Sequence, residues 1–188
     1  MNNVNSNPNG TLRRAIPGAG AKARFKEEML ENGSFEEWNA GQPAAWEAVK
    51  GAGAAWREAG VARTPEARSG ESAVLLAPGE EDKWIGLTQK IDPEKMMVDR
   101  TLRFSAMVKA PRAEQVHVIV SFVRGGKRYS PKESYKGSGD WEEVLWLFEV
   151  PPEADPSSFR FEILRAPGSP GQVVVDDASA TFVHVQLF

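Results

Sequence analysis

Few residues in this sequence could carry out catalysis. None of the 188 residues is a cysteine, which excludes a thiolate zinc site, a disulfide framework and a cysteine nucleophile. The two histidines, His117 and His184, are too few for a multi-histidine metal centre. The acidic pairs Glu36-Glu37 and Glu142-Glu143 are adjacent in sequence. Adjacent side chains of a strand point to opposite faces, so neither pair can form the facing acid and base of a glycosidase. The sequence therefore predicts a protein that is not an enzyme.

The elements that would position any functional side chain have the two-residue period of β-strands. Apolar and polar residues alternate in 101–109 and 141–150. Shorter apolar runs, separated by turns rich in glycine and proline, lie at 44–49, 54–59, 71–77, 83–91, 158–165 and 172–185. The pattern contains no long amphipathic helix. It predicts an all-β fold, an antiparallel β-sandwich.

Two neighbouring segments differ from this alternation. Residues 116–123 are apolar on both faces apart from His117 and Ser121. This predicts a central strand whose second face is covered by loops or by a ligand. The segment that follows, 124–139, is polar and rich in glycine, and we expect it to be a long loop.

The N-terminal 25 residues differ in charge from the rest of the chain. They contain Arg13, Arg14, Lys22 and Arg24 and no acid, a net charge of +4. The other 163 residues carry 19 basic and 26 acidic side chains, a net charge of −7. Residues 1–24 hold too few large apolar side chains to fold alone. We expect an extended arm at 1–25, either flexible or docked on a protein partner, and a folded domain at 26–188.

Three segments of the domain carry motifs of a known family. The first is Asn32-Gly33-Ser34-Phe35-Glu36-Glu37-Trp38, followed by Pro43 and Trp46. The second comprises Ser69-Gly70, Gln89 and strand 102–109. The third comprises Gly139-Asp140-Trp141, Phe148-Glu149-Val150-Pro151 and 173–179. In this order they resemble the jelly-roll carbohydrate-binding modules of the galactose-binding-domain-like superfamily. The resemblance covers about residues 30–182. It implies a jelly roll and a non-catalytic module that attaches to glycans or to a surface.

The resemblance also implies a structural calcium ion. In such modules the metal is held by the Glu of the opening motif, by the turn of small residues and by a late Asp. These correspond here to Glu36, an oxygen near Ser69, and Asp176 or Asp177. The adjacent carboxylates of Asp176 and Asp177 would repel each other unless a positive charge lies nearby. The alternative is that the two aspartates cap a turn, with one of them paired to an arginine or a lysine.

Aromatic side chains are the best candidates for binding a sugar, because a flat ring stacks on the apolar face of a pyranose. Four tryptophans are assigned to packing by the motifs or by the strand period: Trp38, Trp46, Trp141 and Trp146. The remaining candidates for ligand contact are Trp84, Tyr129, Tyr135 and Trp56, with Gln89, Arg103 and His117 as hydrogen-bonding groups. Each of these could instead be an ordinary, partly exposed surface residue.

Two functions stay open at this point. The first is a carbohydrate-binding module whose partner is an oligo- or polysaccharide. The alternative is a structural or assembly protein, such as a decoration or tail-associated component of a virus particle, anchored by its basic arm. The acidic domain argues against duplex nucleic acid, and no apolar run approaches the ~20 residues that span a bilayer. No secretory signal is recognisable, and attachment to a virion or to a cell surface is compatible with either function.

Overall fold

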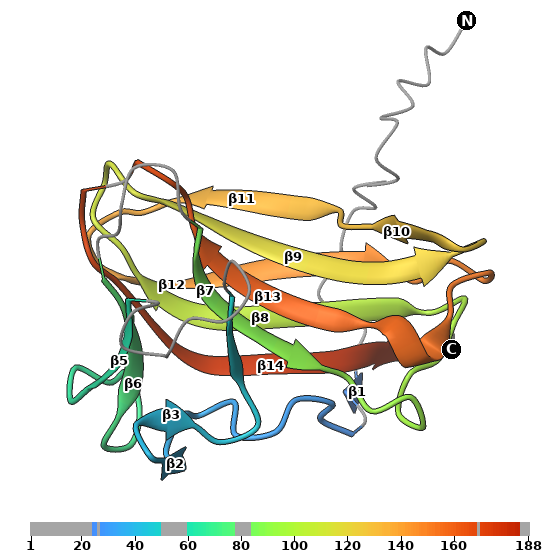
Figure 1. Cartoon of the computed structure of the whole chain (residues 1–188), viewed down its shortest axis with the longest axis horizontal. Coiled ribbons are helices and arrows are strands. Elements are labelled where there is room, and N and C mark those ends of the chain that lie inside the picture. Colours follow the sequence, from blue (N-terminus) through green and yellow to red (C-terminus); the bar gives the residue numbers. More distant parts are fainter. Residues whose placement is uncertain (1–23, 26, 50–59, 78–83, 169, 185–188) are drawn as a thin grey trace, which may run out of the picture.

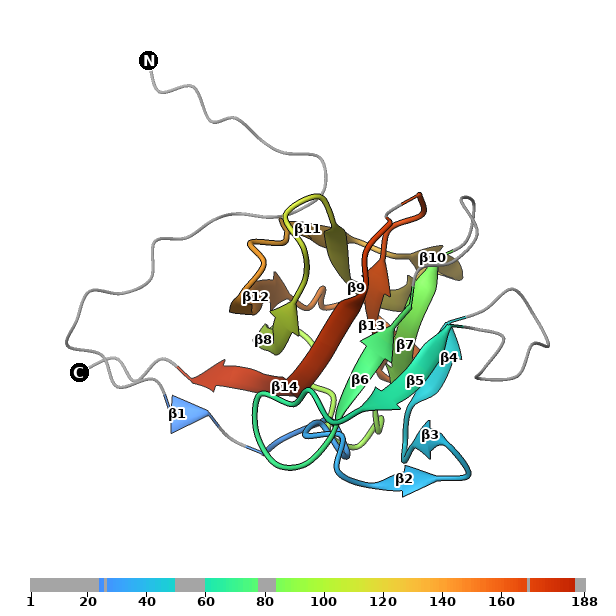
Figure 2. The ribbon, with the colours of Figure 1, turned by 90° about the vertical axis from the view of Figure 1, so that its left-hand side faces the viewer.

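The computed structural model describes residues 24–25, 27–49, 60–77, 84–168 and 170–184, which form an antiparallel β-sandwich (Figure 1). The first sheet has the strand order β12-β8-β14-β6-β5, and β1 is also paired with β14. Its strands are β1 (Arg24–Phe25), β5 (Val61–Thr64), β6 (Ala73–Leu76), β8 (Thr101–Lys109), β12 (Trp141–Glu149) and β14 (Val173–His184). Figure 2 shows β14, β6 and β5 side by side in this sheet.

The second sheet has the strand order β10-β9-β13-β7-β4, and β11 is also paired with β9. Its strands are β4 (Glu47–Val49), β7 (Ile85–Lys90), β9 (Gln115–Arg124), β10 (Lys127–Tyr129), β11 (Lys132–Lys136) and β13 (Arg160–Arg165). A small hairpin of β2 (Trp38–Asn39) and β3 (Gln42–Pro43) and the 3₁₀ turn η1 (Pro156–Ser158) complete the described elements. The predicted all-β antiparallel sandwich is confirmed.

Alternate side chains of the long strands fill the space between the two sheets. The buried sets are Leu102, Phe104, Ala106 and Val108 in β8, Val116, Val118, Val120 and Phe122 in β9, and Val144, Trp146 and Phe148 in β12. These are the apolar positions of the two-residue pattern in the sequence. The strand predicted to be central, 116–123, is indeed flanked on one side by β13 and on the other by β10 and β11.

Aromatic rings join the two sheets across the core. Phe104 of β8 stacks on Phe161 of β13, with ring centroids 4.7 Å apart and planes 7° from parallel. Phe122 of β9 contacts Phe148 of β12 with centroids 5.8 Å apart. Burying one such side chain contributes about 1.5–3 kcal/mol to folding. Contacts of this kind hold the sheets in a fixed relation, and so decide which strand faces remain on the outside.

Buried charges close one end of the sandwich. The side chain of Arg165 is 1% exposed and that of Glu114 is fully buried, with Nε and Oε2 3.5 Å apart. Arg165 Nε also donates to the carbonyl of Gly171 at 3.0 Å, and Gly171 N–H donates to Glu114 Oε1. The pair therefore ties the residue before β9 to the end of β13 and to the loop before β14. Loss of either partner would leave a buried charge uncompensated.

The tryptophans of the opening motif pack as expected. The side chain of Trp46 is buried, lies 5.2 Å from Phe35 between ring centroids, and donates its indole N–H to the carbonyl of Glu31. Trp38 packs against the core and donates to Ser72 Oγ. Trp146 is buried in β12, whereas Trp141 is half-buried. The assignment of Trp38, Trp46 and Trp146 to packing is confirmed.

Two details of the predicted elements are wrong. Residues 124–139 are not one long loop, because they contain β10 and β11, which both pair with β9 (Figure 1). An exposed edge strand needs no apolar residues on its outer face, so polarity alone did not distinguish it from a loop. The sequence analysis also predicted no strand at 61–64, where the structure has β5. The strand predicted at 54–59 lies outside the described residues.

Most of the predicted N-terminal arm lies outside the described residues, including Arg13, Arg14 and Lys22. Arg24, which was assigned to the arm, lies in β1 and pairs with His184 of β14. The first sheet therefore begins one residue before the predicted end of the arm. No helix in the described part of the chain is long and apolar enough to cross a membrane.

The packing of Phe161 on Phe104 predicts a large loss of stability on truncation. We expect Phe161→Ala to lower the free energy of unfolding by about 3–5 kcal/mol, because it removes a fully buried ring from between the sheets. Leu147→Ala is the control, since Leu147 is 40% exposed and should change stability by less than about 0.5 kcal/mol. Urea unfolding followed by tryptophan fluorescence measures both. Equal effects of the two changes would contradict this description of the core.

Candidate functional site

Polar side chains occupy the outer face of the second sheet, on the side opposite to the core. His117 and Ser121 of β9 alternate with the core residues of that strand, and Glu162 of β13 pairs in register with Thr88 of β7. We call these four residues the polar face. The side chains of His117, Ser121 and Thr88 are only 4%, 1% and 8% exposed, although they lie on the side of the sheet that points away from the core. Polar groups buried in this way are costly unless they find partners.

His117 of the polar face contacts residues of two other segments. Its Nδ1 lies 2.7 Å from Ser134 Oγ of β11, and its ring lies edge-on to Trp84 with centroids 5.2 Å apart. Lys132 Nζ lies 5.7 Å from the centre of the Trp84 ring. Burial, and secondarily the charge of Lys132, lowers the pKa of His117. The imidazole is therefore neutral at pH 7, and one of its nitrogens can accept a hydrogen bond.

The other members of the polar face form a partly satisfied network. Ser121 Oγ donates to Glu162 Oε1 at 2.8 Å, and Arg128 Nη2 donates to Ser121 Oγ at 3.3 Å. Thr88, between β4 and β13, has a buried hydroxyl with no hydrogen-bond partner among the described residues. An unsatisfied buried hydroxyl costs about 1–3 kcal/mol. The polar face thus retains hydrogen-bonding capacity that the described chain does not use.

The structure does not bring the seven ligand candidates to one place. Trp84 and His117 are in contact at the polar face, and Trp84 is 41% exposed. Trp56 lies outside the described residues. The remaining four are positioned elsewhere, and each has a structural contact of its own.

Two tyrosines and two hydrogen-bonding candidates have these separate positions. Tyr129 stacks on Phe122, with centroids 5.6 Å apart, and is packed against the core. The Tyr135 hydroxyl donates to the carbonyl of Leu145 in β12. The Gln89 side chain is buried, and its amide exchanges two hydrogen bonds with the backbone of Glu31. Arg103 lies in the first sheet, paired with Glu143.

Sequence reasoning missed several residues at or beside the polar face. Lys132 and Ser134 fall in the segment predicted to be a long loop, and Thr88 falls in the predicted strand 83–91 and is not among the ligand candidates. The sequence of 132–136 gives little signal, because one of the two residues on its inner side is the charged Glu133. In the structure Lys132, Ser134 and Lys136 are exposed and the residues between them are half-buried. That alternation is typical of a strand with one face in solvent.

The residues predicted to hold calcium lie around one turn but act as hydrogen-bond acceptors. The buried Asp176 carboxylate accepts N–H groups of Arg68 (2.7 Å), Ser69 (3.0 Å) and Asp177 (2.8 Å). Glu36 Oε1 accepts the backbone N–H groups of Glu71 and Ser72, and Asp177 accepts the Ser69 hydroxyl. Burial raises the pKa of Asp176, and these N–H groups oppose the rise.

This arrangement does not fit a calcium site. Calcium is surrounded by oxygens that point towards it, whereas here N–H donors point at the carboxylates. Within the described ranges no group of three or more His, Cys, Asp or Glu side chains could hold a metal ion. The close approach of Gly70 to Glu36, where an added Cβ would lie 2.2 Å from Oε1, is explained by the same hydrogen bonds. Asp176 thus binds the first half of the turn at 68–72, and Glu36 binds the second half.

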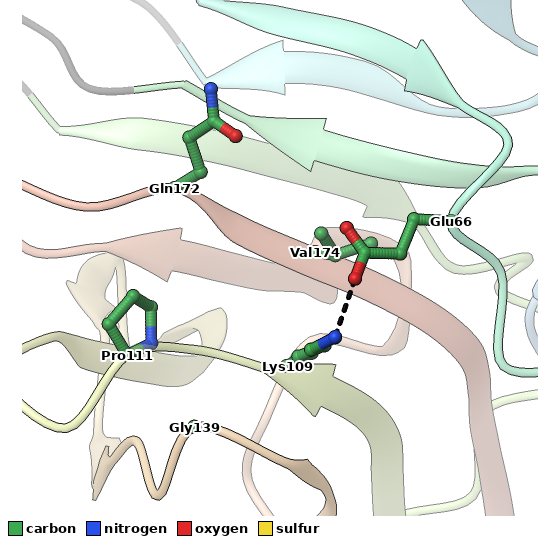
Figure 3. Close-up of a pocket in the computed structure, with 6 residues that line it drawn as sticks. All are labelled: Glu66, Lys109, Pro111, Gly139, Gln172 and Val174. Atoms are coloured by element: carbon green, nitrogen blue, oxygen red, sulfur yellow. Dashed lines mark hydrogen bonds and ion pairs between the residues drawn. The ribbon is translucent and has the colours of Figure 1, made fainter.

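A hollow of about 420 Å³ lies on the outer side of the first sheet. Figure 3 shows its lining residues, with Lys109 and Glu66 facing each other across an ion pair of 2.6 Å. The remaining lining residues are Pro111, Gly139, Gln172 and Val174. No aromatic side chain lines it, and its only opposite charges are paired. It therefore offers less to a sugar than the polar face does.

The fold is shared with solved carbohydrate-binding modules. The C-terminal family 22 module of Clostridium thermocellum Xyn10B matches with a TM-score of 0.62 and 14% identity, over 87% of this chain and 96% of that one. The chain has the jelly-roll fold of carbohydrate-binding modules. The CBM22-1 xylan-binding domain of Paenibacillus barcinonensis Xyn10C matches with a TM-score of 0.63 and 17% identity, over 88% and 100% of the two chains.

The jelly roll is also found in a larger viral protein. The enzymatically active domain of bacteriophage CBA120 tailspike protein 4 matches with a TM-score of 0.60 and 13% identity, over 82% of this chain and 21% of that one. No protein-family model and no curated protein matches the sequence. At these identities the likeness establishes the fold, and the residues of the site must carry any argument about function.

The hydrogen bonds around Asp176 predict how the turn at 68–72 responds to metal and to mutation. We expect the melting temperature to be the same in calcium and in EDTA. We expect Asp176→Asn to lower the free energy of unfolding by about 1–3 kcal/mol, because an amide has only one oxygen to accept three N–H groups. Scanning calorimetry measures both. A melting temperature that falls in EDTA and recovers with calcium would instead support the predicted metal.

Proposed function

We propose that this protein is a non-catalytic carbohydrate-binding module and that the polar face, with Trp84, is its binding surface. The fold is shared with xylan-binding modules. The observation that carries the proposal is the exposed indole of Trp84 beside the buried imidazole of His117. It combines an apolar ring in solvent with hydrogen-bonding groups next to it.

The chemistry of the surface suits a sugar chain. The Trp84 ring offers a flat platform to the C–H face of a pyranose, and Ser134 and Glu162 offer groups that bond hydroxyls. Because these side chains come from β11, from β13 and from the residue before β7, the surface is extended rather than a closed pocket. An extended surface favours a polysaccharide over a monosaccharide. A xylan or a xylo-oligosaccharide is accordingly the first ligand to test.

The position of Trp84 predicts that truncating it removes binding without unfolding the protein. We expect Trp84→Ala to weaken binding to xylan at least about tenfold, since loss of an aromatic platform removes more than about 1.4 kcal/mol. Affinity gel electrophoresis in xylan-containing gels measures the change. Met97→Ala is the matched control, because Met97 is equally exposed, at 41%, and lies outside the polar face.

Two outcomes would contradict the proposal. The first is that neither xylan nor any other plant or microbial polysaccharide retards the wild-type protein in the gel. The other is equal retardation of the wild type and Trp84→Ala, which would place the sugar elsewhere. Circular dichroism of both variants excludes a loss of fold as the cause.

A second candidate function is a structural part of a virus particle. The match to a bacteriophage tailspike domain favours it, together with the +4 charge of residues 1–25. The chain would then carry its jelly roll on a larger assembly, held by the basic arm. This function does not require Trp84.

Deletion of residues 1–23 tests the arm and leaves β1 in place. If the arm anchors the protein, the shortened chain should keep its melting temperature and lose co-sedimentation with the particle, because β1 still pairs with β14. Co-sedimentation that is unchanged by the deletion would contradict the anchoring role. Retention of xylan binding by the shortened chain separates this function from the first.

A further inference from the structure

The strand pair beside the polar face has an unusual charge. Residues 124–136 contain Arg124, Lys127, Arg128, Lys132 and Lys136, and only one acid, Glu133. The whole chain has 23 basic and 26 acidic side chains, so this short segment is strongly basic within an acidic domain. Local excess charge of one sign attracts ligands of the opposite sign.

Three of these basic side chains lie on the same side of the sheet as the polar face. Lys132 and Lys136 alternate with half-buried residues of β11 and share the exposed side with Ser134, which contacts His117. Arg128 of β10 donates to Ser121 of the polar face. Both strands pair along the same edge of β9. We call Arg128, Lys132 and Lys136 the basic rim.

The basic rim lacks carboxylate partners in the described part of the chain. The ion pairs found there use other cations: Arg103, Lys109, Arg160 and Arg165. The acid nearest the rim on the polar face, Glu162, accepts a hydrogen bond from Ser121. Glu80, Glu81 and Asp82 precede Trp84 in the sequence and lie outside the described residues. The three cations of the rim are therefore available to an anionic ligand. Lys132 lies beside the Trp84 ring, and Lys136 and Arg128 lie further along the same edge of β9, in register with Gln115 and Val123.

We propose that the polysaccharide bound at the polar face is acidic and bears uronic acid carboxylates. This inference rests on the proposed function and specifies its ligand. The Trp84 ring contacts a sugar of the backbone, and the carboxylate lies against the basic rim. Lys132 can contact both the backbone sugar and the carboxylate, because its Nζ lies over the Trp84 ring at the border between the polar face and the basic rim. Arg128 adds a planar guanidinium that can take a carboxylate in bidentate fashion.

The decisive experiment uses one polysaccharide in two forms. The native form is glucuronoxylan, and the reduced form is the same preparation after chemical reduction of its carboxyl groups to alcohols. The two forms differ in charge and share their backbone. We expect the full chain to bind the native form about fivefold more tightly than the reduced form, as two exposed ion pairs would give. We also expect this preference to disappear in high salt. Isothermal calorimetry measures both affinities.

Matched variants locate the effect. Lys136→Gln should lower affinity for the native form and leave affinity for the reduced form within twofold. Lys132→Gln/Lys136→Gln should lower affinity for the native form further, and only the single change avoids the Lys132 contact with Trp84. Lys109→Gln removes the same charge from the outer side of the first sheet, in the hollow of Figure 3, and should change neither affinity.

Each remaining outcome has one meaning. Equal binding of the native and reduced forms would overturn the inference and leave the proposed function standing. Binding of neither form would overturn the proposed function. The preference for the native form could instead persist in the rim variants and be lost in Lys109→Gln. That result would assign the acidic ligand to the first sheet and overturn the inference.

Discussion

The face-to-face packing of Phe104 on Phe161 is the contact on which the rest of the structure depends. It joins β8, an inner strand of the first sheet, to β13, the middle strand of the second. Once Phe161 and Val118 face the core, the two-residue period of a strand forces Glu162 and His117 to the opposite side. The position of the polar face is therefore a consequence of core packing. A shift of register by one residue would bury Glu162 and expose the phenylalanine.

The polar face costs stability that the core must offset. His117, Ser121 and Thr88 are buried polar side chains on a sheet face, and the Thr88 hydroxyl has no partner in the described residues. Replacing them with apolar residues would give a more ordinary sandwich. Structures accept such costs where a ligand or ordered water completes the hydrogen bonds. The buried polar side chains and the exposed Trp84 lie on the same side of the second sheet.

The sequence predicted the parts of this protein that follow from alternation. The all-β sandwich, the central position of 116–123, and the inclusion of Trp84 and His117 among the candidates all came from local patterns. The contact between those two residues could not be predicted, because they are far apart in the sequence and meet only through the pairing of β7 and β9 with β13. Asp176 shows the same limit. Its charge was visible in the sequence, but the three N–H groups around it come from a distant turn and from its own neighbour.

Mapping the surface that a sugar touches tests the central claim most directly. Two-dimensional amide NMR spectra of the isotope-labelled chain, recorded during titration with a xylo-oligosaccharide, report every contacted strand at once. The largest saturable shifts should lie in β7, β9 and β11 and at the indole N–H of Trp84. Largest shifts at Lys109, Gln172 and Val174, in the hollow on the first sheet, would contradict the assignment of the polar face as the binding surface.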